Sequence, residues 1–178
     1  MGKLEGKVAL VTGSGRNIGR ATVLRLAREG AHVVVNARSN QQEAEAVARE
    51  ARDLGVKAVP VLADVGKKAE VEALAARALS EFGRVDILIN NAAIRPHMPF
   101  IETTDADWEL IRGVVLDGPL YLTRALDRAY GQGSLRAHSV LRRRRLDFRS
   151  RQWPHSFICS EDGADRHGAR ARLGICPP

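Results

Sequence analysis

A glycine-rich stretch near the N-terminus has the residue types and the spacing of a phosphate-binding turn. It reads Thr12-Gly13-Ser14-Gly15-Arg16-Asn17-Ile18-Gly19. Gly13 permits a tight turn, Gly15 leaves room for a pyrophosphate beside the backbone, and Gly19 lets the following helix pack closely. Phosphate charge would then lie at the helix N-terminus. An ordinary strand-to-helix turn is the alternative, and the place of the stretch between a predicted strand and a predicted helix counts against it.

The segments around this stretch alternate between strand and helix patterns. Residues 7–12 form an apolar run rich in β-branched side chains, which predicts a buried parallel strand. Residues 17–29 carry apolar side chains at helical spacing, which predicts a helix that stops at Gly30. The same cycle predicts strands at 32–36, 57–61 and 86–90, helices at 40–54 and 67–82, and a fourth helix at about 105–129, capped by Thr104 or Asp105 and kinked near Gly118-Pro119. We therefore expect an α/β fold, a doubly wound parallel sheet of the Rossmann type with strand order 3-2-1-4.

The pattern stops near Tyr130. Residues 131–178 contain four consecutive arginines at 142–145, carry most of the net charge of +7, and show no sustained strand or helix period. We predict a nucleotide-binding half-domain at 1–130, truncated after the fourth strand and fourth helix, and an irregular Arg-rich tail at 131–178. Cys159 and Cys176 lack metal-ligand spacing, so no metal site is expected. With no leader and no apolar run of membrane-spanning length, we expect a cytoplasmic protein without a membrane partner.

These motifs together resemble the short-chain dehydrogenase/reductase family over about residues 4–130. The family fingerprint is T-G-x-x-x-G-x-G, and Asn17 stands where its middle glycine usually does. Asparagine tolerates left-handed backbone better than other non-glycine residues, so the loop is expected to form. Further matches follow in the family's order: Asp64-Val65, Asn90-Asn91-Ala92-Ala93, Leu116-Asp117-Gly118-Pro119 and Leu122-Thr123-Arg124-Ala125. The resemblance implies that Asp64-Val65 flanks an adenine, and that the segment at Asn90, Asn91 and Ala92 supports the sheet and the nicotinamide side of the cofactor.

The choice of cofactor is argued from charge at the end of the second predicted strand. NAD-selective relatives usually place an aspartate there to bind the ribose hydroxyls, and this chain has Ala37. Arg38, with Ser39 beside it, and Arg16 of the glycine-rich stretch would supply guanidinium groups for a 2′-phosphate. We therefore predict NADP, with NAD less favoured. The alternative for Arg38 is a solvated surface charge.

The resemblance implies an oxidoreductase that transfers hydride between NADP(H) and a small-molecule carbonyl or secondary alcohol, and a homo-oligomer, which is in doubt for this chain. The family's proton donor is the tyrosine of a Tyr-x-x-x-Lys pair, and no such pair occurs in the sequence. At the helix position where the family has an asparagine, this chain has Val115. We therefore assign no catalytic residue and expect a catalytically defective chain. A dinucleotide-binding pseudoenzyme is the alternative function.

Two origins account for the tail at 131–178. One is a coding sequence read out of frame, because a shift by one base allows a strand, a serine turn and a lysine-bearing helix of the family's kind in order. The other is a basic module that binds nucleic acid or an acidic partner. We favour the frameshift and expect no nucleic-acid partner, since the tail has few aromatic residues and no recognisable binding motif.

Overall fold

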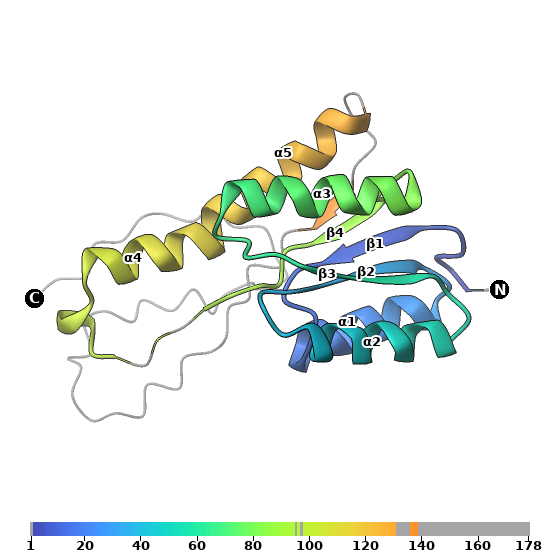
Figure 1. Ribbon diagram of the computed structural model, residues 1–178, viewed down its shortest axis with the longest axis horizontal. Coiled ribbons are helices and arrows are strands. Elements are labelled where there is room, and N and C mark those ends of the chain that lie inside the picture. The colour runs from blue at the N-terminus through green and yellow to red at the C-terminus, as the bar shows by residue number, and fades with distance from the viewer. Residues whose placement is uncertain (1, 95, 97, 131–135, 139–178) are drawn as a thin grey trace, which may run out of the picture. The chain divides into compact units, whose positions relative to one another are not determined.

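The computed structural model describes residues 2–94, 96, 98–130 and 136–138 (Figure 1). The four arginines at 142–145, both cysteines and most of the tail predicted at 131–178 lie outside these residues. The predicted division at residue 130 therefore stays a prediction.

Strands and helices alternate along the described chain as the sequence pattern predicts (Figure 1). The strands are β1 Val8–Val11, β2 His32–Ala37, β3 Ala58–Leu62, β4 Ile87–Ile89 and β5 Arg136–His138, and the α-helices are α1 Asn17–Arg28, α2 Gln41–Asp53, α3 Lys68–Phe82, α4 Asp105–Arg112 and α5 Gly118–Tyr130. All neighbouring strands pair in parallel, in the order β3-β2-β1-β4-β5. The predicted doubly wound parallel sheet and the order of its first four strands are confirmed.

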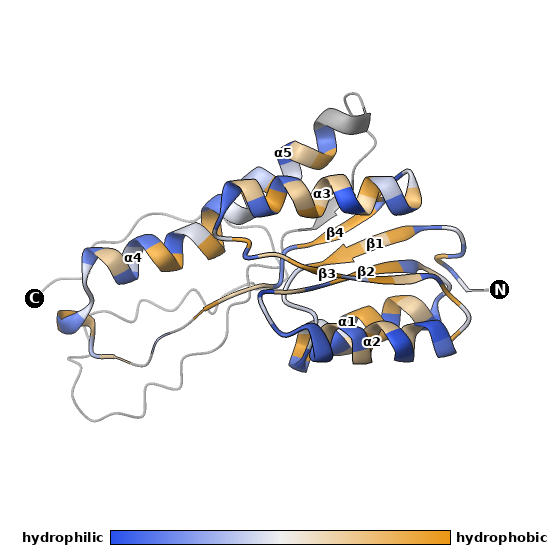
Figure 2. Cartoon of the chain, viewed as in Figure 1, coloured by the Kyte–Doolittle hydropathy of each residue, from blue (hydrophilic) through white to orange (hydrophobic). Residues whose placement is uncertain are grey.

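The sheet is buried on both faces because each face carries its own apolar layer. Val8 and Leu10 of β1 pack toward α3 and α5, whereas Ala9 and Val11 pack toward α1 and α2. This split follows from the alternation of side chains along a strand. Figure 2 shows the result as apolar strands between helices whose outer faces are polar.

Two features beyond β4 differ from the sequence prediction. The chain returns to the sheet at β5, so the prediction of no regular element after residue 131 is wrong for these three residues. They pair in parallel with β4. Main-chain pairing of this kind depends on distant neighbours and leaves little periodic signal in so short a segment.

The predicted fourth helix is divided rather than simply kinked. Thr104 caps α4 reciprocally with Asp107, as the sequence suggests. A π-helical segment, η2 (Gly113–Asp117), then joins α4 to α5. Pro119 lacks the N–H that would bond back to the carbonyl of Val115, and a Cβ at Gly118 would lie 2.4 Å from the Val65 carbonyl oxygen. The wider turn thus comes just before a residue that must be glycine to touch the β3–α3 loop.

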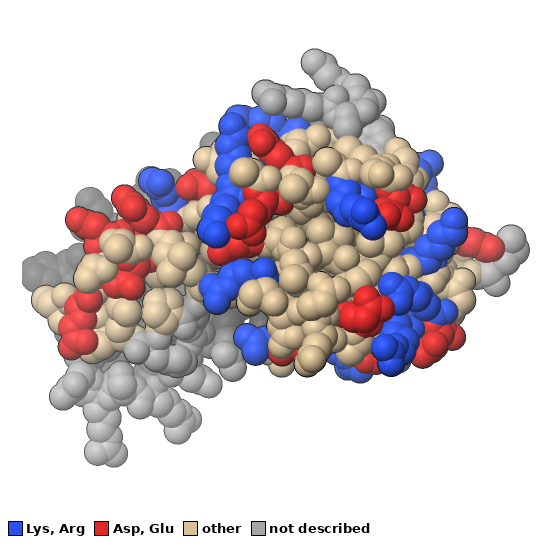
Figure 3. Space-filling model, in the orientation of Figure 1, with Lys and Arg blue, Asp and Glu red and all other residues tan. Residues whose placement is uncertain are grey.

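Charges are mixed over the face shown in Figure 3, where basic and acidic groups lie beside one another. Exposed pairs along α3, such as Arg77 with Glu81 at 2.7 Å, are of this type. Such exposed pairs contribute little to stability, on the order of 0–1 kcal/mol each. Within the described residues, no helix is both long enough and apolar enough to cross a membrane.

Candidate functional site

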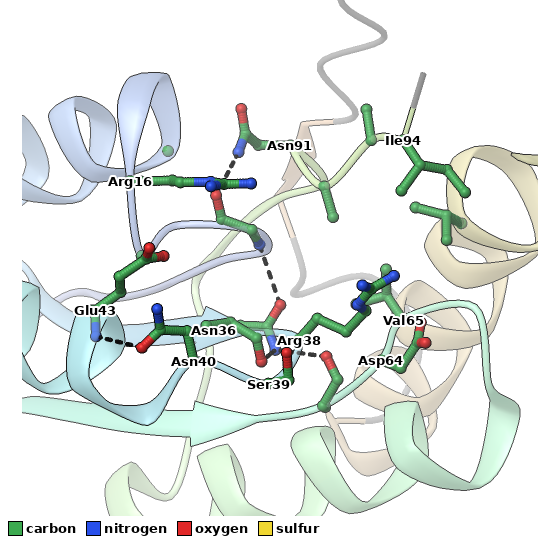
Figure 4. Close-up of a pocket in the computed structure, with 18 of the residues that line it drawn as sticks. Arg16, Asn36, Arg38, Ser39, Asn40, Glu43, Asp64, Val65, Asn91 and Ile94 are labelled. Atoms are coloured by element: carbon green, nitrogen blue, oxygen red, sulfur yellow. Dashed lines mark hydrogen bonds between the residues drawn. The ribbon is translucent and has the colours of Figure 1, made fainter. Parts of the chain in front are cut away.

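A cavity of about 500 Å³ opens where β1, β2, β3 and β4 end at one edge of the sheet (Figure 4). Parallel register brings these carboxyl ends together, so the loops that follow the strands meet around one space. Most of the sequence-predicted cofactor residues line it: Gly13, Gly15, Arg16, Asn17, Ile18, Gly19, Ala37, Arg38, Ser39, Asp64, Val65, Asn91 and Ala92. The structure therefore brings together residues that lie up to 79 positions apart in the sequence.

Two predicted site residues, Ser14 and Asn90, do not line the cavity. Ser14 is fully buried; its hydroxyl donates to the Val11 carbonyl at 2.7 Å and accepts from the Asn36 N–H at 3.0 Å. Asn90 is also buried, at 7% exposure.

The glycines of the loop have different structural roles. Gly13 has φ 61°, and a Cβ there would lie 2.9 Å from Cα of Ala92. A Cβ at Gly19 would lie 2.3 Å from the Gly13 carbonyl oxygen, so this glycine lets α1 pack against the loop. A Cβ at Gly15 would meet only ordinary contacts, 3.4 Å from Glu43 Cβ and 3.5 Å from Ala37 Cβ. The fold therefore requires glycine at Gly13 and Gly19. Gly15, by contrast, leaves space on the cavity side.

The start of α1 presents main-chain donors to the cavity. Asn17, the first helical residue, has φ 51°, the one positive value at a non-glycine residue in the described chain. This left-handed conformation agrees with the predicted exchange of glycine for asparagine. No side chain caps the helix at Arg16, and its first turn contains no acidic residue. Its unpaired N–H groups are thus suited to an anion such as a phosphate.

Sequence reasoning missed Asn36, which fixes the glycine-rich loop from behind. This buried side chain accepts from the Gly13 N–H at 3.1 Å and donates to the Ala63 carbonyl at 3.1 Å. Its amide nitrogen also lies 3.3 Å from the carbonyl oxygens of Ala37 and Val61. A polar residue inside an otherwise apolar strand is the signal that points to such a role.

The loop after β4 is tied to the glycine-rich loop through Asn91 and Thr12. The Thr12 hydroxyl accepts from the N–H groups of Asn91 and Ala92, both at 3.0 Å. The Asn91 side chain donates to the carbonyls of Thr12 at 2.9 Å and Gly13 at 3.1 Å. Asn91 thus joins the loop after β4 to the glycine-rich loop.

The charged residues of the cavity are Arg16, Arg38, Glu43 and Asp64 (Figure 4). The arginines found in ion pairs within the described chain are others: Arg20, Arg25, Arg52, Arg77, Arg84 and Arg112. Both cavity arginines are therefore available to an anionic ligand. The sequence analysis did not identify Glu43, which α2 contributes to the opposite side of the cavity from Asp64.

The β3–α3 turn beside Asp64 is held by carboxylates. Asp64 Oδ1 accepts from the Gly66 N–H at 2.9 Å, and Glu70 accepts from the Asp64 N–H at 2.6 Å. This last bond, followed by the hydrogen bond from Lys67, lowers the pKa of Glu70. The Glu70 carboxylate in turn raises the pKa of Lys67.

The described part of the cavity contains no tyrosine or lysine. Tyr121 instead lines a separate hollow of about 80 Å³ with Lys68, Glu72, Arg124 and Ala125. Val114 of η2 lines the main cavity, so the segment that includes Val115 passes beside it. The cavity wall at Val114 is therefore aliphatic.

Comparison with known proteins agrees with this architecture. The family model for short chain dehydrogenase matches residues 7–134. An uncharacterized oxidoreductase of Methylorubrum extorquens is 39% identical over 133 residues, 75% of this chain and 54% of that protein. A hydroxynaphthalene reductase-like protein of Metarhizium robertsii is 43% identical over 108 residues, 61% of this chain and 40% of that protein. The chain thus spans about half the length of the curated relatives that it matches.

Solved structures show the same fold and include cofactor complexes. A short chain dehydrogenase of Burkholderia cenocepacia, in complex with NADP, superposes with TM-score 0.73 at 34% identity over 77% of this chain and 56% of that one. A blue fluorescent protein from a metagenomic library, in complex with NADPH, gives TM-score 0.68 at 35% identity over 70% of this chain and 51% of that one. With its glycine-rich loop, its sheet order and its family match in agreement, the chain belongs to the short-chain dehydrogenase/reductase family.

Proposed function

We propose that the chain binds NADP(H) in the cavity at the carboxyl edge of the sheet. The observation that carries this proposal is the convergence on one space of the glycine-rich loop, the uncapped start of α1 and two arginines that make no ion pair with any described residue. The cofactor complexes of two similar structures support it. The NADP preference rests on Ala37, which leaves no acid at the end of β2, and on Arg38 next to it.

The residues present fit a dinucleotide, and each part of the cofactor would be bound by a different set of them. Gly13, Gly15 and the first turn of α1 would hold the pyrophosphate, while Asp64 and Val65 would flank the adenine. Arg38, with Ser39 and Arg16, would bind the 2′-phosphate through charge-assisted hydrogen bonds. Asn91 and Ala92 would border the nicotinamide side. The bound cofactor supplies hydride chemistry, and these residues supply binding and orientation.

For the whole protein we propose oxidoreduction of a small-molecule carbonyl or secondary alcohol, with this chain catalytically defective. A carbonyl that receives hydride develops negative charge on its oxygen, which needs a positioned proton donor. The sequence contains no Tyr-x-x-x-Lys pair, and the described cavity wall at Val114 is aliphatic. Binding without turnover is therefore the behaviour that we expect, as in the pseudoenzyme alternative.

Titration calorimetry with NADPH and NADP⁺ tests the binding, with Gly15→Ala as the decisive variant. Its new methyl group meets only ordinary protein contacts but occupies cavity space, so stability should hold while affinity falls about tenfold or more. Gly113→Ala is the matched control, because a Cβ there has its nearest contact at 3.5 Å and the residue does not line the cavity. Equal affinities in Gly15→Ala and the unaltered chain would contradict the proposed site. Absence of binding to the unaltered chain would contradict the proposed function.

Turnover is tested by following NADPH absorbance with a panel of ketones. Loss of positioned acid catalysis costs about a hundredfold to ten-thousandfold in rate. We expect no rate above the background without protein, and family-typical turnover would refute the proposed defect.

A further inference from the structure

The cavity contains the acidic residue Glu43 close to Ala37, the end of β2, where the strand itself supplies no acid. Ala37 occupies the end of β2, where an acid would bind the ribose hydroxyls. A Cβ on Gly15 would lie 3.5 Å from Ala37 Cβ, 3.4 Å from Glu43 Cβ and 3.6 Å from Glu43 Oε2. A side chain at Gly15 would thus contact both Ala37, at the end of β2, and the Glu43 carboxylate of α2.

The local structure of α2 leaves this carboxylate turned to the cavity. Asn40 caps α2 by accepting from the Glu43 N–H at 3.1 Å, so Glu43 is the third helical residue. In α4 the equivalent Asp107 reaches back to the N–H of its cap residue, Thr104, at 3.0 Å. The side chain of Glu43 makes no such return bond and lines the cavity half-buried (Figure 4).

Among the residues that the structure describes, Glu43 has no ion-pair partner that would neutralise it. Its helix neighbours Glu45 and Glu50 pair with Arg52 and Arg20, whereas Glu43 is absent from the ion pairs of the described chain. Arg38, by contrast, extends toward Asp64 and Val65 (Figure 4). Glu43 therefore supplies a negative group beside Ala37 on the α2 side of the cavity, and the positive group of Arg38 lies toward Asp64 and Val65.

We propose that Glu43 is a specificity-determining residue that acts in place of the missing strand-end acid, accepting hydrogen bonds from the adenosine ribose and opposing a 2′-phosphate. This inference rests on the proposed dinucleotide binding. The preference between NADP and NAD then reflects a balance in which Arg38 attracts the phosphate and Glu43 repels it. Glu43→Gln keeps the shape of the side chain and removes its charge, so it should shift the balance toward NADP.

The test measures dissociation constants of NADP⁺ and NAD⁺ for the unaltered chain, Glu43→Gln and the control Glu45→Gln. We expect Glu43→Gln to raise the ratio of the NAD⁺ to the NADP⁺ constant about tenfold, the size of one charge-assisted contact. Glu45→Gln, which removes the same charge from the same helix, should leave the ratio within about twofold, because Glu45 pairs with Arg52 outside the cavity.

A purely structural role at the helix start would change stability or both constants together, not their ratio. An unchanged ratio in Glu43→Gln, or an equal shift in Glu45→Gln, would overturn the assignment while dinucleotide binding itself stands. If the unaltered chain binds neither dinucleotide, the proposed function fails instead. Glu43→Gln in an Arg38→Ala background provides a second readout, since removal of the repulsion should still favour NADP⁺ when the attracting arginine is gone.

Discussion

Replacing Asn36 with alanine should both destabilise the fold and weaken cofactor binding. The side-chain amide accepts from the Gly13 N–H and donates to the Ala63 carbonyl, both at 3.1 Å, and the residue is 1% exposed. Alanine would leave these two polar groups without their partner, the Ala63 carbonyl in a buried residue and the Gly13 N–H in a half-buried one. Each such buried group costs about 1–3 kcal/mol. Further carbonyls at 3.3 Å add less, because the amide has only two hydrogens to share among three acceptors.

We therefore expect Asn36→Ala to lower the free energy of unfolding by about 2–4 kcal/mol, a large part of the stability of an ordinary domain. The glycine-rich loop would also lose the bond that holds Gly13. The loop would then have to become ordered when the cofactor binds, and the entropy cost of that ordering reduces the free energy of binding. The dissociation constant of NADPH should therefore rise about tenfold. Urea unfolding and titration calorimetry measure the two effects on the same preparation.

The matched control is Asn40→Ala, which removes an asparagine from the same cavity. Asn40 caps α2 with a hydrogen bond to the Glu43 N–H, and loss of such a cap costs about 1 kcal/mol. Asn36→Asp supplies a second comparison: it retains an acceptor for Gly13 but faces carbonyl oxygens with another oxygen, so it should be at least as damaging as alanine. Refutation would be an Asn36→Ala chain no less stable than Asn40→Ala that binds NADPH with unchanged affinity.

Three further predictions concern charge, packing and pH. Arg38→Ala should weaken NADP⁺ binding by roughly tenfold to a hundredfold without a similar loss for NAD⁺, because a charge-assisted contact contributes about 1.5–3 kcal/mol. Titration calorimetry measures both affinities, with Arg49→Ala, at an exposed position of α2, as the control. Unchanged NADP⁺ affinity would count against the phosphate site. Gly19→Ala should destabilise the chain by about 1–3 kcal/mol in urea unfolding, since its Cβ would lie 2.3 Å from the Gly13 carbonyl oxygen, whereas a stable Gly19→Ala chain would contradict the close packing of α1. The pKa of Asp86 is lowered because hydrogen bonds from the Val8 N–H, Arg84 and Lys7 outweigh the opposing effect of burial. The unfolded chain therefore binds this proton more readily, so the stabilisation is present above about pH 4 and is lost as the pH falls below it. Urea titrations at a series of pH values should show that the free energy of unfolding falls less at acid pH in Asp86→Asn than in the unaltered chain. An identical pH dependence would refute the assignment.

Local pattern alone was enough to predict most elements of this protein. Strands such as β1 are short apolar runs that no surface segment would tolerate, and α1 and α3 repeat apolar side chains at the helical period and end next to a glycine. The glycine-rich loop could also be recognised, because Gly13 and Gly19 are required by backbone geometry within a few residues of one another. These features depend on short-range sterics and on burial, and both can be inferred from residues that are neighbours in the sequence.

The tertiary structure decided which side chains share the cavity. Asn36 is hydrogen-bonded to Gly13 and Ala63, which lie 23 and 27 positions away, and the residues next to it in the sequence do not predict these partners. Glu43 faces Gly15 only because α2 packs beside the loop, and β5 forms only because β4 offers unpaired main-chain groups. Such contacts arise from the parallel register of distant strands, which a one-dimensional pattern does not encode. For that reason the sequence by itself predicted the glycine-rich loop and the two arginines as cavity residues, whereas Glu43 could be placed in the same cavity only when the strands and helices were brought together.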